Sequence, residues 1–255
     1  MNNNDKFRFS NIDKFRELSL NGEDIKIAVL ELKRNKEHAQ WVIEMIKMIV
    51  PNAQVDLFLW ENLIQAEKIY AEIEIGKYDI LNVSLIGIAF RQSPRFNVIA
   101  LNTFIVAAAG NSGEEEYVYP ASDDKCLSVG ATFNGEVKSS FSTFNDKLDI
   151  LNFNGVELPS GKTFNGTSCS APYTVGMIAL FFQLYKRRHG RNPMIGEVTE
   201  YVHENCLDVY EEGFDKLSGY GVFRLSFDFE KKIWDWKTQQ YLTISEWLDS
   251  IKKEG

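Results

Sequence analysis

The sequence lacks both a membrane-spanning stretch and the features of a secretory signal. Its first residues, MNNNDKFRFSNIDKFREL, carry a charge every few positions. They contain neither the apolar segment nor the small-residue cleavage site that a signal peptide needs. No apolar run approaches the roughly 20 residues that cross a bilayer. From these absences we expect a cytoplasmic protein with no membrane partner.

Cysteine is scarce, and its number is odd. Three cysteines at irregular spacing suit reduced thiols better than a disulfide framework, which also favours the cytosol. No Cys and His residues follow the spacing of a zinc site, so we expect no metal. The cysteines are Cys126, Cys169 and Cys206.

Positive charge is in deficit. Lys and Arg number 28 against 36 Asp and Glu, which gives a formal charge of -8 and argues against nucleic acid as a partner. A hydrophobic content of 44% over 255 residues is enough for one large core and excludes a disordered chain. No internal repeat or low-complexity linker divides the sequence.

What the chain does contain is an alternation of apolar, β-branched segments with segments of helical spacing. We expect strands at 25–32, 53–60, 78–86 and 104–111, and shorter strands at 126–132, 137–144 and 148–153. We expect helices at 38–49, 61–76, just after Pro94, and at 168–188 and 194–206. This alternation predicts an α/β fold with a mostly parallel central sheet and helices on both faces.

The chain divides into an N-terminal extension (1–23), a main domain (24–225) and a C-terminal extension (226–255). The C-terminal extension holds three of the 5 Trp residues at what reads as helical spacing. We therefore expect a C-terminal helix packed on the domain. The alternative is a Trp-rich segment that binds a partner protein.

The strongest chemical signal is the string FNGTSCSAPYTVG, residues 164–176, at the start of the expected long helix. In the first turn of that helix, the backbone N–H groups around Ser168 favour a negatively charged oxygen. Gly166 lets a substrate backbone approach, and Thr167 belongs to the same candidate binding site. A helix N-terminus capped by Thr167 or Ser168 is the simpler interpretation, but it does not account for the whole string.

This string resembles the nucleophile motif of the subtilase family of serine proteases, in which Gly-Thr-Ser is followed by small residues and Pro. Ser168 takes the place of the nucleophilic serine. Two further strings, FIVAAAGNSG (104–113) and YDILNVSLIG (78–87), are similar to family strands that border the active site. The resemblance runs from about Asp24 to Leu225 and implies a subtilisin-like three-layer fold.

By this resemblance, Asn111 stands where the family has the amide donor of its oxyanion hole. The C-terminal end of a strand is where open α/β sheets bind ligands, although Asn-Ser-Gly alone is also a turn sequence. Ile86 stands where the family usually has Gly. The expected substrate-binding residues are Ser84, Leu85, Gly87, Ala108, Ala109, Gly110, Glu114, Gly166 and Thr167.

Glu114, together with Glu115 and Glu116, follows Asn111 in the loop that forms a wall of the first specificity pocket in relatives. These acids would favour Lys or Arg before the cleaved bond. A solvated acidic loop is an equally good interpretation.

The third block departs from the family. Glu31 stands where relatives carry the triad Asp, and His38 follows seven positions later, at the place of the family's His. Glu can accept the hydrogen bond of an imidazole, and a strand-to-helix connection can be as short as ~2–6 residues. Glu37 and Asp24 are alternative carboxylates, and a solvated Glu31 is the interpretation without function.

Histidine is scarce enough to narrow the choice of base, because the chain has only 3. His189 lies in the basic string KRRHGR, which suits the C-terminus of a helix. His203 lies on a later amphipathic helix with no family motif. His38 remains, although a lone His on an apolar helix is often structural.

The resemblance therefore implies a serine endopeptidase in which Ser168 attacks, His38 is the base, Glu31 orients it and Asn111 stabilises the oxyanion. No cofactor is expected, and no calcium, because the family's calcium loops are missing. We expect a dedicated intracellular peptide or protein substrate, such as a ribosomally made precursor or a regulator in a toxin or defence system. The alternative is a catalytically inactive subtilase-like protein that binds a peptide or partner.

Overall fold

The computed structural model describes residues 1–87, 90, 93–226, 233–235, 239–243 and 246. Its main strands are β1 (Lys26–Leu32), β2 (Gln54–Trp60), β3 (Ile80–Val83), β4 (Phe104–Ala108), β5 (Cys126–Thr132), β6 (Ile150–Phe153), β9 (Cys206–Leu207) and β10 (Val222–Phe223). They form one eight-stranded sheet in the order β2-β1-β3-β4-β5-β6-β10-β9. Every neighbouring pair is parallel except β9 and β10 at one edge.

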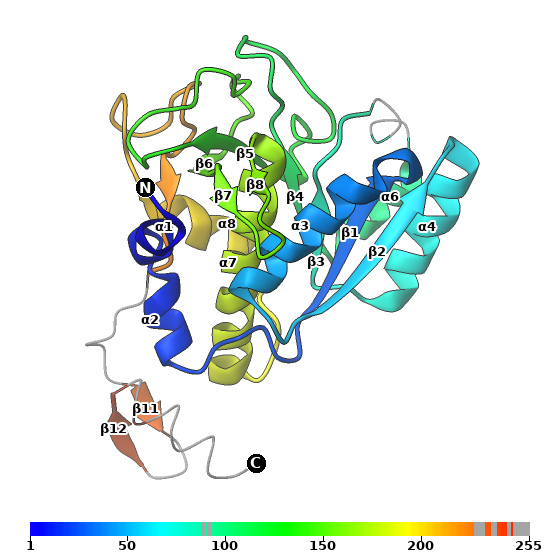
Figure 1. Cartoon of the computed structure of the whole chain (residues 1–255). Helices are drawn as coiled ribbons and strands as arrows, with labels where there is room; N and C mark the ends of the chain where they lie inside the picture. The colour runs from blue at the N-terminus through cyan, green and yellow to red at the C-terminus, as the bar shows by residue number, and fades with distance from the viewer. Residues whose placement is uncertain (88–89, 91–92, 227–232, 236–238, 244–245, 247–255) are drawn as a thin grey trace.

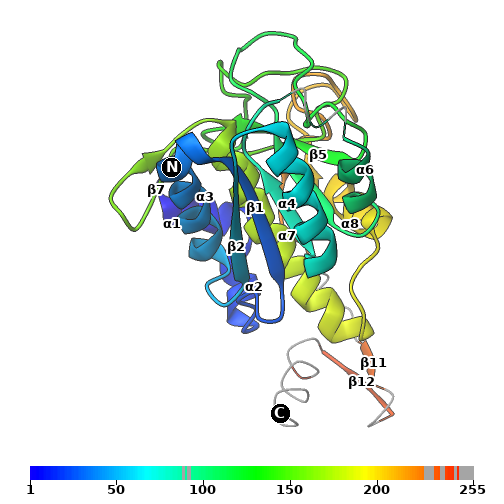
Figure 2. The ribbon, with the colours of Figure 1, turned by 90° about the vertical axis from the view of Figure 1, so that its right-hand side faces the viewer.

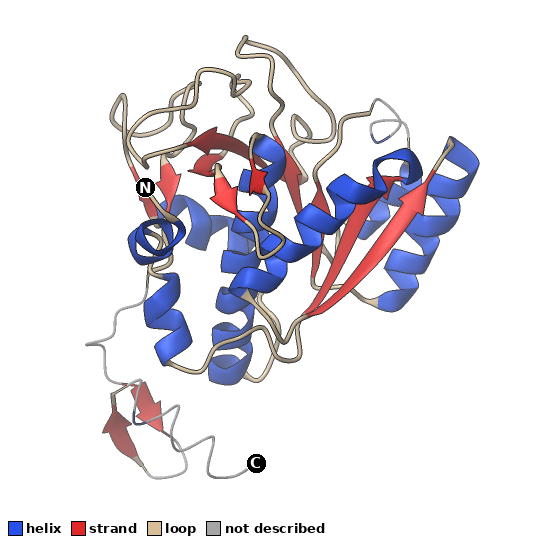
Figure 3. Cartoon of the chain, in the orientation of Figure 1, coloured by secondary structure: helices blue, strands red, loops and turns tan. Residues whose placement is uncertain are grey.

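Helices cover both faces of this sheet (Figures 1 and 3). They are α1 (Asn3–Phe9), α2 (Ile12–Glu17), α3 (Lys36–Ile49), α4 (Leu63–Gly76), α6 (Pro94–Ile99), α7 (Thr167–His189) and α8 (Ile195–Glu204), with a short 3-10 turn η1 (Lys33–Asn35) before α3. Among the described helices, none combines the length and apolarity needed to span a membrane.

Two hydrophobic cores lie on opposite sides of the sheet. The larger core buries side chains of α1, α2, α3, α7 and α8, and it includes Ile49 and Ile178. The smaller core is formed with α4 and α6, through Tyr70 and Phe96. Figure 2 shows α3 and α6 on opposite sides of β1 and β2. The expected α/β fold with a mostly parallel sheet is thus confirmed, in three layers.

The expected strand at 137–144 is wrong. In the structure this segment makes only isolated bridges, in which Lys138 pairs with Thr132 and Phe144 with Glu115. Its run of Ser and Thr offers little apolar surface to bury, so side-chain hydrogen bonds to the backbone take the place of a ladder. A two-stranded hairpin that the sequence did not reveal, β7 (Val156–Glu157) and β8 (Thr163–Phe164), leads directly into α7.

The first 23 residues are packed into the main body. Lys6 is buried, and its Nζ donates to the Asn154 carbonyl at 2.9 Å and to the Gly155 carbonyl. Burial lowers the pKa of this Lys6 amine. The fully or nearly fully buried apolar side chains of the segment are Phe7, Ile12, Phe15 and Leu20. The N-terminal extension therefore contributes to the larger core.

Where residues of 226–255 are described, residues 233–235 and 240–242 form strands in place of the expected helix, whereas Glu246 is helical. Two short strands, β11 (Ile233–Asp235) and β12 (Gln240–Leu242), pair antiparallel and lie apart from the main sheet (Figure 1). β-branched and aromatic residues in alternation favour an extended chain over a helix. The rest of the expected helix, including Trp236 and Trp247, lies outside the described residues.

Candidate active site

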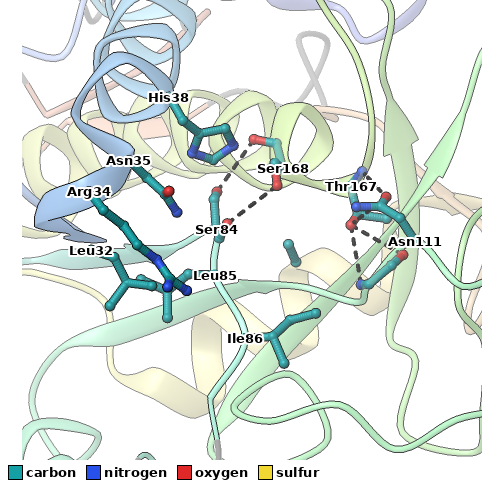
Figure 4. A pocket seen from close by; sticks show the side chains of 12 residues that line it. Leu32, Arg34, Asn35, His38, Ser84, Leu85, Ile86, Asn111, Thr167 and Ser168 are labelled. Atoms are coloured by element: carbon teal, nitrogen blue, oxygen red, sulfur yellow. Dashed lines mark hydrogen bonds between the residues drawn. The ribbon is translucent and has the colours of Figure 1, made fainter. Parts of the chain in front are cut away.

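Four elements bring functional side chains to one edge of the sheet. Because β1, β3 and β4 are adjacent and parallel, their carboxyl ends lie together, as at the ligand sites of open α/β sheets. Ser84 follows β3 directly, Ala108 ends β4, and Ser168 lies in the first turn of α7. A cleft of about 410 Å³ opens between these residues (Figure 4).

Glu31 and His38 form a close pair beside this cleft. The Oε2 atom of Glu31 lies 2.6 Å from Nδ1 of His38. Glu31 is only 1% exposed, whereas His38 is 25% exposed and lines the cleft. Because β1 ends at Leu32 and α3 begins at Lys36, the first turn of α3 places His38 next to the strand that carries Glu31.

Both members of the pair are held in orientation by their surroundings. The second carboxylate oxygen, Oε1 of Glu31, accepts hydrogen bonds from Leu32 N at 2.7 Å and Asn35 Nδ2 at 3.4 Å. A buried carboxylate needs such partners. On the other side, the Phe164 ring meets the His38 ring edge-on, with 5.5 Å between their centroids. The imidazole is thus fixed between the end of β1 and the end of β8.

Ser168 shares the cleft with His38 but has a different hydrogen-bond partner. Its Oγ donates to the Ser84 carbonyl at 3.3 Å. No hydrogen bond between Ser168 and His38 is found among the described residues. The N-cap of α7, Gly166, has a φ of 87°, a conformation that favours glycine. A Cβ at Gly166 would also lie 3.2 Å from Oδ1 of Asn111.

Asn111 is oriented by the residue that precedes Ser168. Its Oδ1 accepts hydrogen bonds from the Thr167 N–H at 2.9 Å and from Thr167 Oγ1 at 3.1 Å. Thr167 is fully buried and also receives the Gly110 N–H at 3.2 Å. Since its oxygen is occupied, Asn111 presents its amide NH₂ group for donation, and it lines the cleft with Ser168 (Figure 4).

The cleft contains most of the substrate-binding residues that the sequence predicts. Those that line it are Ser84, Leu85, Ala108, Gly110 and Thr167. Those that lie outside its lining are Gly87, Ala109, Gly166 and Glu114. Glu114 is exposed, and its neighbour Glu115 pairs with Lys216 at 2.6 Å. The acidic loop therefore lies outside the cleft lining.

Four lining residues were not predicted, namely Leu32, Arg34, Asn35 and Ile86. Three of them belong to the short connection between Glu31 and His38. The shortness of that connection places it near the cleft, but Lys33 in the same connection pairs with Glu61 instead. The sequence therefore contained no signal for which of its side chains line the cleft. Ile86 was noticed only as a departure from Gly.

The other two histidines lie elsewhere. His203 Nε2 is 3.1 Å from Asp149 Oδ1, and its ring stacks on Tyr220 with 3.9 Å between centroids. His189 is the last residue of α7, with its ring 4.2 Å from that of Tyr185. Neither lines the cleft.

The cysteines are free thiols. Cys169, next to Ser168, is fully buried, and burial raises its pKa to about 12. It is therefore protonated at neutral pH and a poor nucleophile. Within the described part of the chain, no group of at least three His, Cys, Asp or Glu residues is placed to hold a metal ion.

Comparisons with known proteins give the family. A model described as "Subtilase family" matches residues 26–221. An "Intracellular serine protease" from Paenibacillus polymyxa is 33% identical over 172 residues, which is 62% of this chain and 52% of the relative. "Subtilisin BL" from Lederbergia lenta is 40% identical over 85 residues, 31% of each chain. The chain thus spans about half, or less, of the length of these relatives.

Two solved structures share the fold. A lanthipeptide protease superposes with a TM-score of 0.74 at 17% identity, over 86% of this chain and 92% of its own. The Prenylagaramide maturation protease PagA gives 0.68 at 20% identity, over 84% and 95%. At such low identity these likenesses establish the fold alone. Since the matching family model covers most of the described main body, including the cleft, the chain belongs to the subtilase family.

Proposed function

We propose that this chain is a serine endopeptidase in which Ser168 is the nucleophile, His38 the general base and Glu31 the residue that orients the base. The observation that carries the proposal is the 2.6 Å contact between Glu31 Oε2 and His38 Nδ1, beside a cleft that also contains Ser168. A buried carboxylate on one side of an imidazole and a serine hydroxyl in the cavity on its other side are the parts of a catalytic triad.

The reaction begins when Ser168 Oγ attacks the carbonyl carbon of the scissile bond and gives its proton to His38 Nε2. With Nδ1–H donating to Glu31, the imidazolium is stabilised and keeps the correct tautomer. His38 then protonates the leaving amine, and the carbon–nitrogen bond breaks. A water molecule repeats the attack on the acyl-enzyme and releases the acid, with His38 again taking and returning the proton.

The negative charge on the substrate oxygen is stabilised by two donors, the Asn111 amide NH₂ and the Ser168 backbone N–H. The hydrogen bonds from Thr167 to Asn111 Oδ1 support this role, because they fix the side chain before substrate arrives. Donors that need no reorganisation during the reaction contribute most to its rate. The first turn of α7 adds its favourable dipole.

A catalytically inactive, peptide-binding protein is the second candidate. It is favoured by one observation, the hydrogen bond from Ser168 Oγ to the Ser84 carbonyl, which leaves the hydroxyl unpaired with His38. A rotation of Oγ about the Cα–Cβ bond of Ser168 changes that partner. Catalytic hydrogen bonds are often long or misaligned before substrate binds, so we favour the protease.

For the substrate, we propose a dedicated peptide inside the cell, such as a ribosomally made precursor from which a leader is removed. Two proteins with the same fold carry the names lanthipeptide protease and maturation protease, and one relative is named an intracellular serine protease. The reduced state expected for the free cysteines suits a cytoplasmic location. We further propose that the Trp-rich C-terminal segment contacts a partner.

The proposal is tested by labelling the purified protein with a fluorophosphonate, which reacts only with an activated serine. We expect the wild type to label, Ser168→Ala to lose all labelling, and His38→Ala to slow it by roughly 10²-fold or more, since the base supplies that much of the reactivity. Asn111→Ala should slow it as well.

The matched control is His203→Ala, which removes a histidine of similar exposure that is also paired with a carboxylate. It should label like the wild type. Circular dichroism establishes that each variant is folded. A folded wild type that does not label would support the peptide-binding candidate instead.

A further inference from the structure

Arg34 brings a positive charge into the cleft. It lies on η1, between Glu31 and His38, and lines the cleft with Leu85 and Ser168. Figure 4 shows its side chain on the side of the cleft away from Asn111, next to Leu85. Ile86 lies further along the same wall. The position is therefore within reach of a peptide whose scissile carbonyl is held at Asn111.

Within the described part of the chain, the Arg34 charge has no partner of opposite charge. Among the described residues, no carboxylate or carbonyl forms an ion pair or hydrogen bond with the Arg34 guanidinium. Glu37, three residues after Arg34, is exposed and lines neither cavity. Two other acidic groups nearby are already engaged. Glu31 pairs with His38, and Glu61 pairs with Lys33 at 3.0 Å. An unpaired cation is notable in a chain with a formal charge of -8.

Arg34 also stands where two cavities meet. A second cavity of about 560 Å³, lined by Lys33, Trp60, Glu61 and Asn62, shares Leu32 and Arg34 with the cleft that holds Ser168. A peptide that extends from Ser168 into this second cavity must pass the guanidinium. A planar guanidinium prefers a carboxylate, which it can bind through two parallel hydrogen bonds.

We propose that Arg34 selects substrates that carry Asp or Glu close to the cleaved bond. The inference rests on one part of the proposed function, which is that substrate peptides bind in the cleft. The acidic loop at Glu114 lies outside the cleft lining, so it does not oppose this preference. Asn35, the other η1 residue that lines the cleft, is engaged with Glu31.

The test uses a library of peptides in which each position near the cleaved bond is varied between Glu, Gln and Lys. Cleavage by the full-length wild type is measured as kcat/KM. Binding of the same fluorescent peptides to Ser168→Ala is measured by anisotropy, so that recognition is read independently of turnover. We expect Glu over Gln at one position by about fivefold or more in both measurements, as an exposed or half-buried ion pair allows.

Arg34→Gln should abolish this preference, and Arg34→Glu should reverse it in favour of Lys. Lys36→Gln is the matched control, since it removes the same charge from an exposed residue two positions further on, which lines neither cavity. It should keep the preference. The preference should also weaken as salt is raised from 0.05 to 0.5 M (~14 to ~4 Å in screening length), because exposed charges are screened.

Each outcome separates the two proposals. Acid-selective binding that depends on Arg34, without cleavage by the wild type, would retain the role of Arg34 and refute the protease. Cleavage with no acid preference at any position would refute the role of Arg34 alone. Absence of both binding and cleavage across the library would overturn both.

Discussion

At the scale of single residues, the feature that sets this site apart is the longer carboxylate at the end of β1. Glu31 is almost fully buried, and both of its oxygens have partners. The additional methylene of Glu, compared with the Asp of relatives, extends the carboxylate toward a histidine that follows after a very short connection.

Substitutions at Glu31 should show this dependence. Glu31→Gln preserves size but presents an amide NH₂ to Nδ1, so the imidazole adopts the wrong tautomer, and we expect kcat to fall by roughly 10²–10⁴-fold with little change in KM. In Glu31→Asp, kcat should fall by less, since the carboxylate is one methylene shorter but keeps its charge. An unchanged kcat in Glu31→Gln would mean that another group orients His38.

The sequence was sufficient to predict that Glu31 and His38 pair and that Ser168 lies close to them, but not that Arg34 lines the cleft. Ser168 and Asn111 lie in strings whose pattern is specific, and Glu31 and His38 are close in sequence, so their proximity is a local property. Which side of the cleft Arg34 occupies depends on how η1 packs against the residues after β3, far away in the chain. Such long-range packing leaves no local pattern.

At the scale of elements, α3 and α7 pack closely against each other at Gly176 and Ile49. A Cβ placed on Gly176 would lie 2.7 Å from Cβ of Ile49, which no real pair of carbons reaches. The missing side chain lets the two helices approach, and these are the helices that carry His38 and Ser168. Their separation is therefore set by a glycine in the middle of α7.

Two glycine substitutions should have opposite effects on stability. Gly176→Ala should lower the free energy of unfolding by about 1–3 kcal/mol, since overpacking outweighs the gain in helix propensity. Gly196→Ala, in α8 with no atom within 4 Å of the new Cβ, should raise it by up to about 1 kcal/mol. Urea unfolding of both variants measures the difference. If both substitutions changed the free energy of unfolding equally, α3 and α7 would be able to move apart at no cost.

Other elements show what periodicity alone cannot provide. The positions of the buried strands along the chain were predictable because apolar runs alternate with amphipathic helices. The structures of the 137–144 segment and of the β11–β12 hairpin were not predictable, since short polar or aromatic stretches fit helix and strand patterns equally well. The burial of Lys6 under the Asn154 carbonyl was also hidden, because a lysine in a charged N-terminus is normally exposed.

At the scale of the whole molecule, several thiol and tyrosine hydroxyl groups are buried in their protonated form. Burial raises the pKa values of all three thiols, to about 12 for Cys169, and raises the pKa of Tyr78 to about 12. The folded protein holds these protons at a pH where the unfolded chain, with thiol pKa values near 9.0, releases them. Folding thus becomes less favourable as the solution becomes more alkaline.

The pH dependence of stability follows from the sign of these shifts. A group whose pKa is higher in the folded state contributes its full stability below the unfolded pKa and loses it as pH rises toward the folded value. We therefore expect the free energy of unfolding to fall between about pH 9 and 12, by about 1.4 kcal/mol per pH unit for each such group.

Urea titrations across this range measure the slope. Cys169→Ala should reduce the slope of the free energy of unfolding against pH by the contribution of one thiol. Lys33→Gln, which leaves every buried thiol in place, should not change the slope. An identical slope in wild type and Cys169→Ala would show that this thiol does not contribute.

The short connection from β1 to α3 has a mechanical consequence. Because Glu31, Arg34 and His38 lie on one short stretch of backbone, we expect them to move as a unit relative to Ser168 at the start of α7. The 2.6 Å contact between Glu31 and His38 would persist in such a motion, so the separation between this stretch and the start of α7 would decide whether the proposed site is assembled. A molecule that changes this separation would act on the reaction and on the position of the Arg34 charge at once.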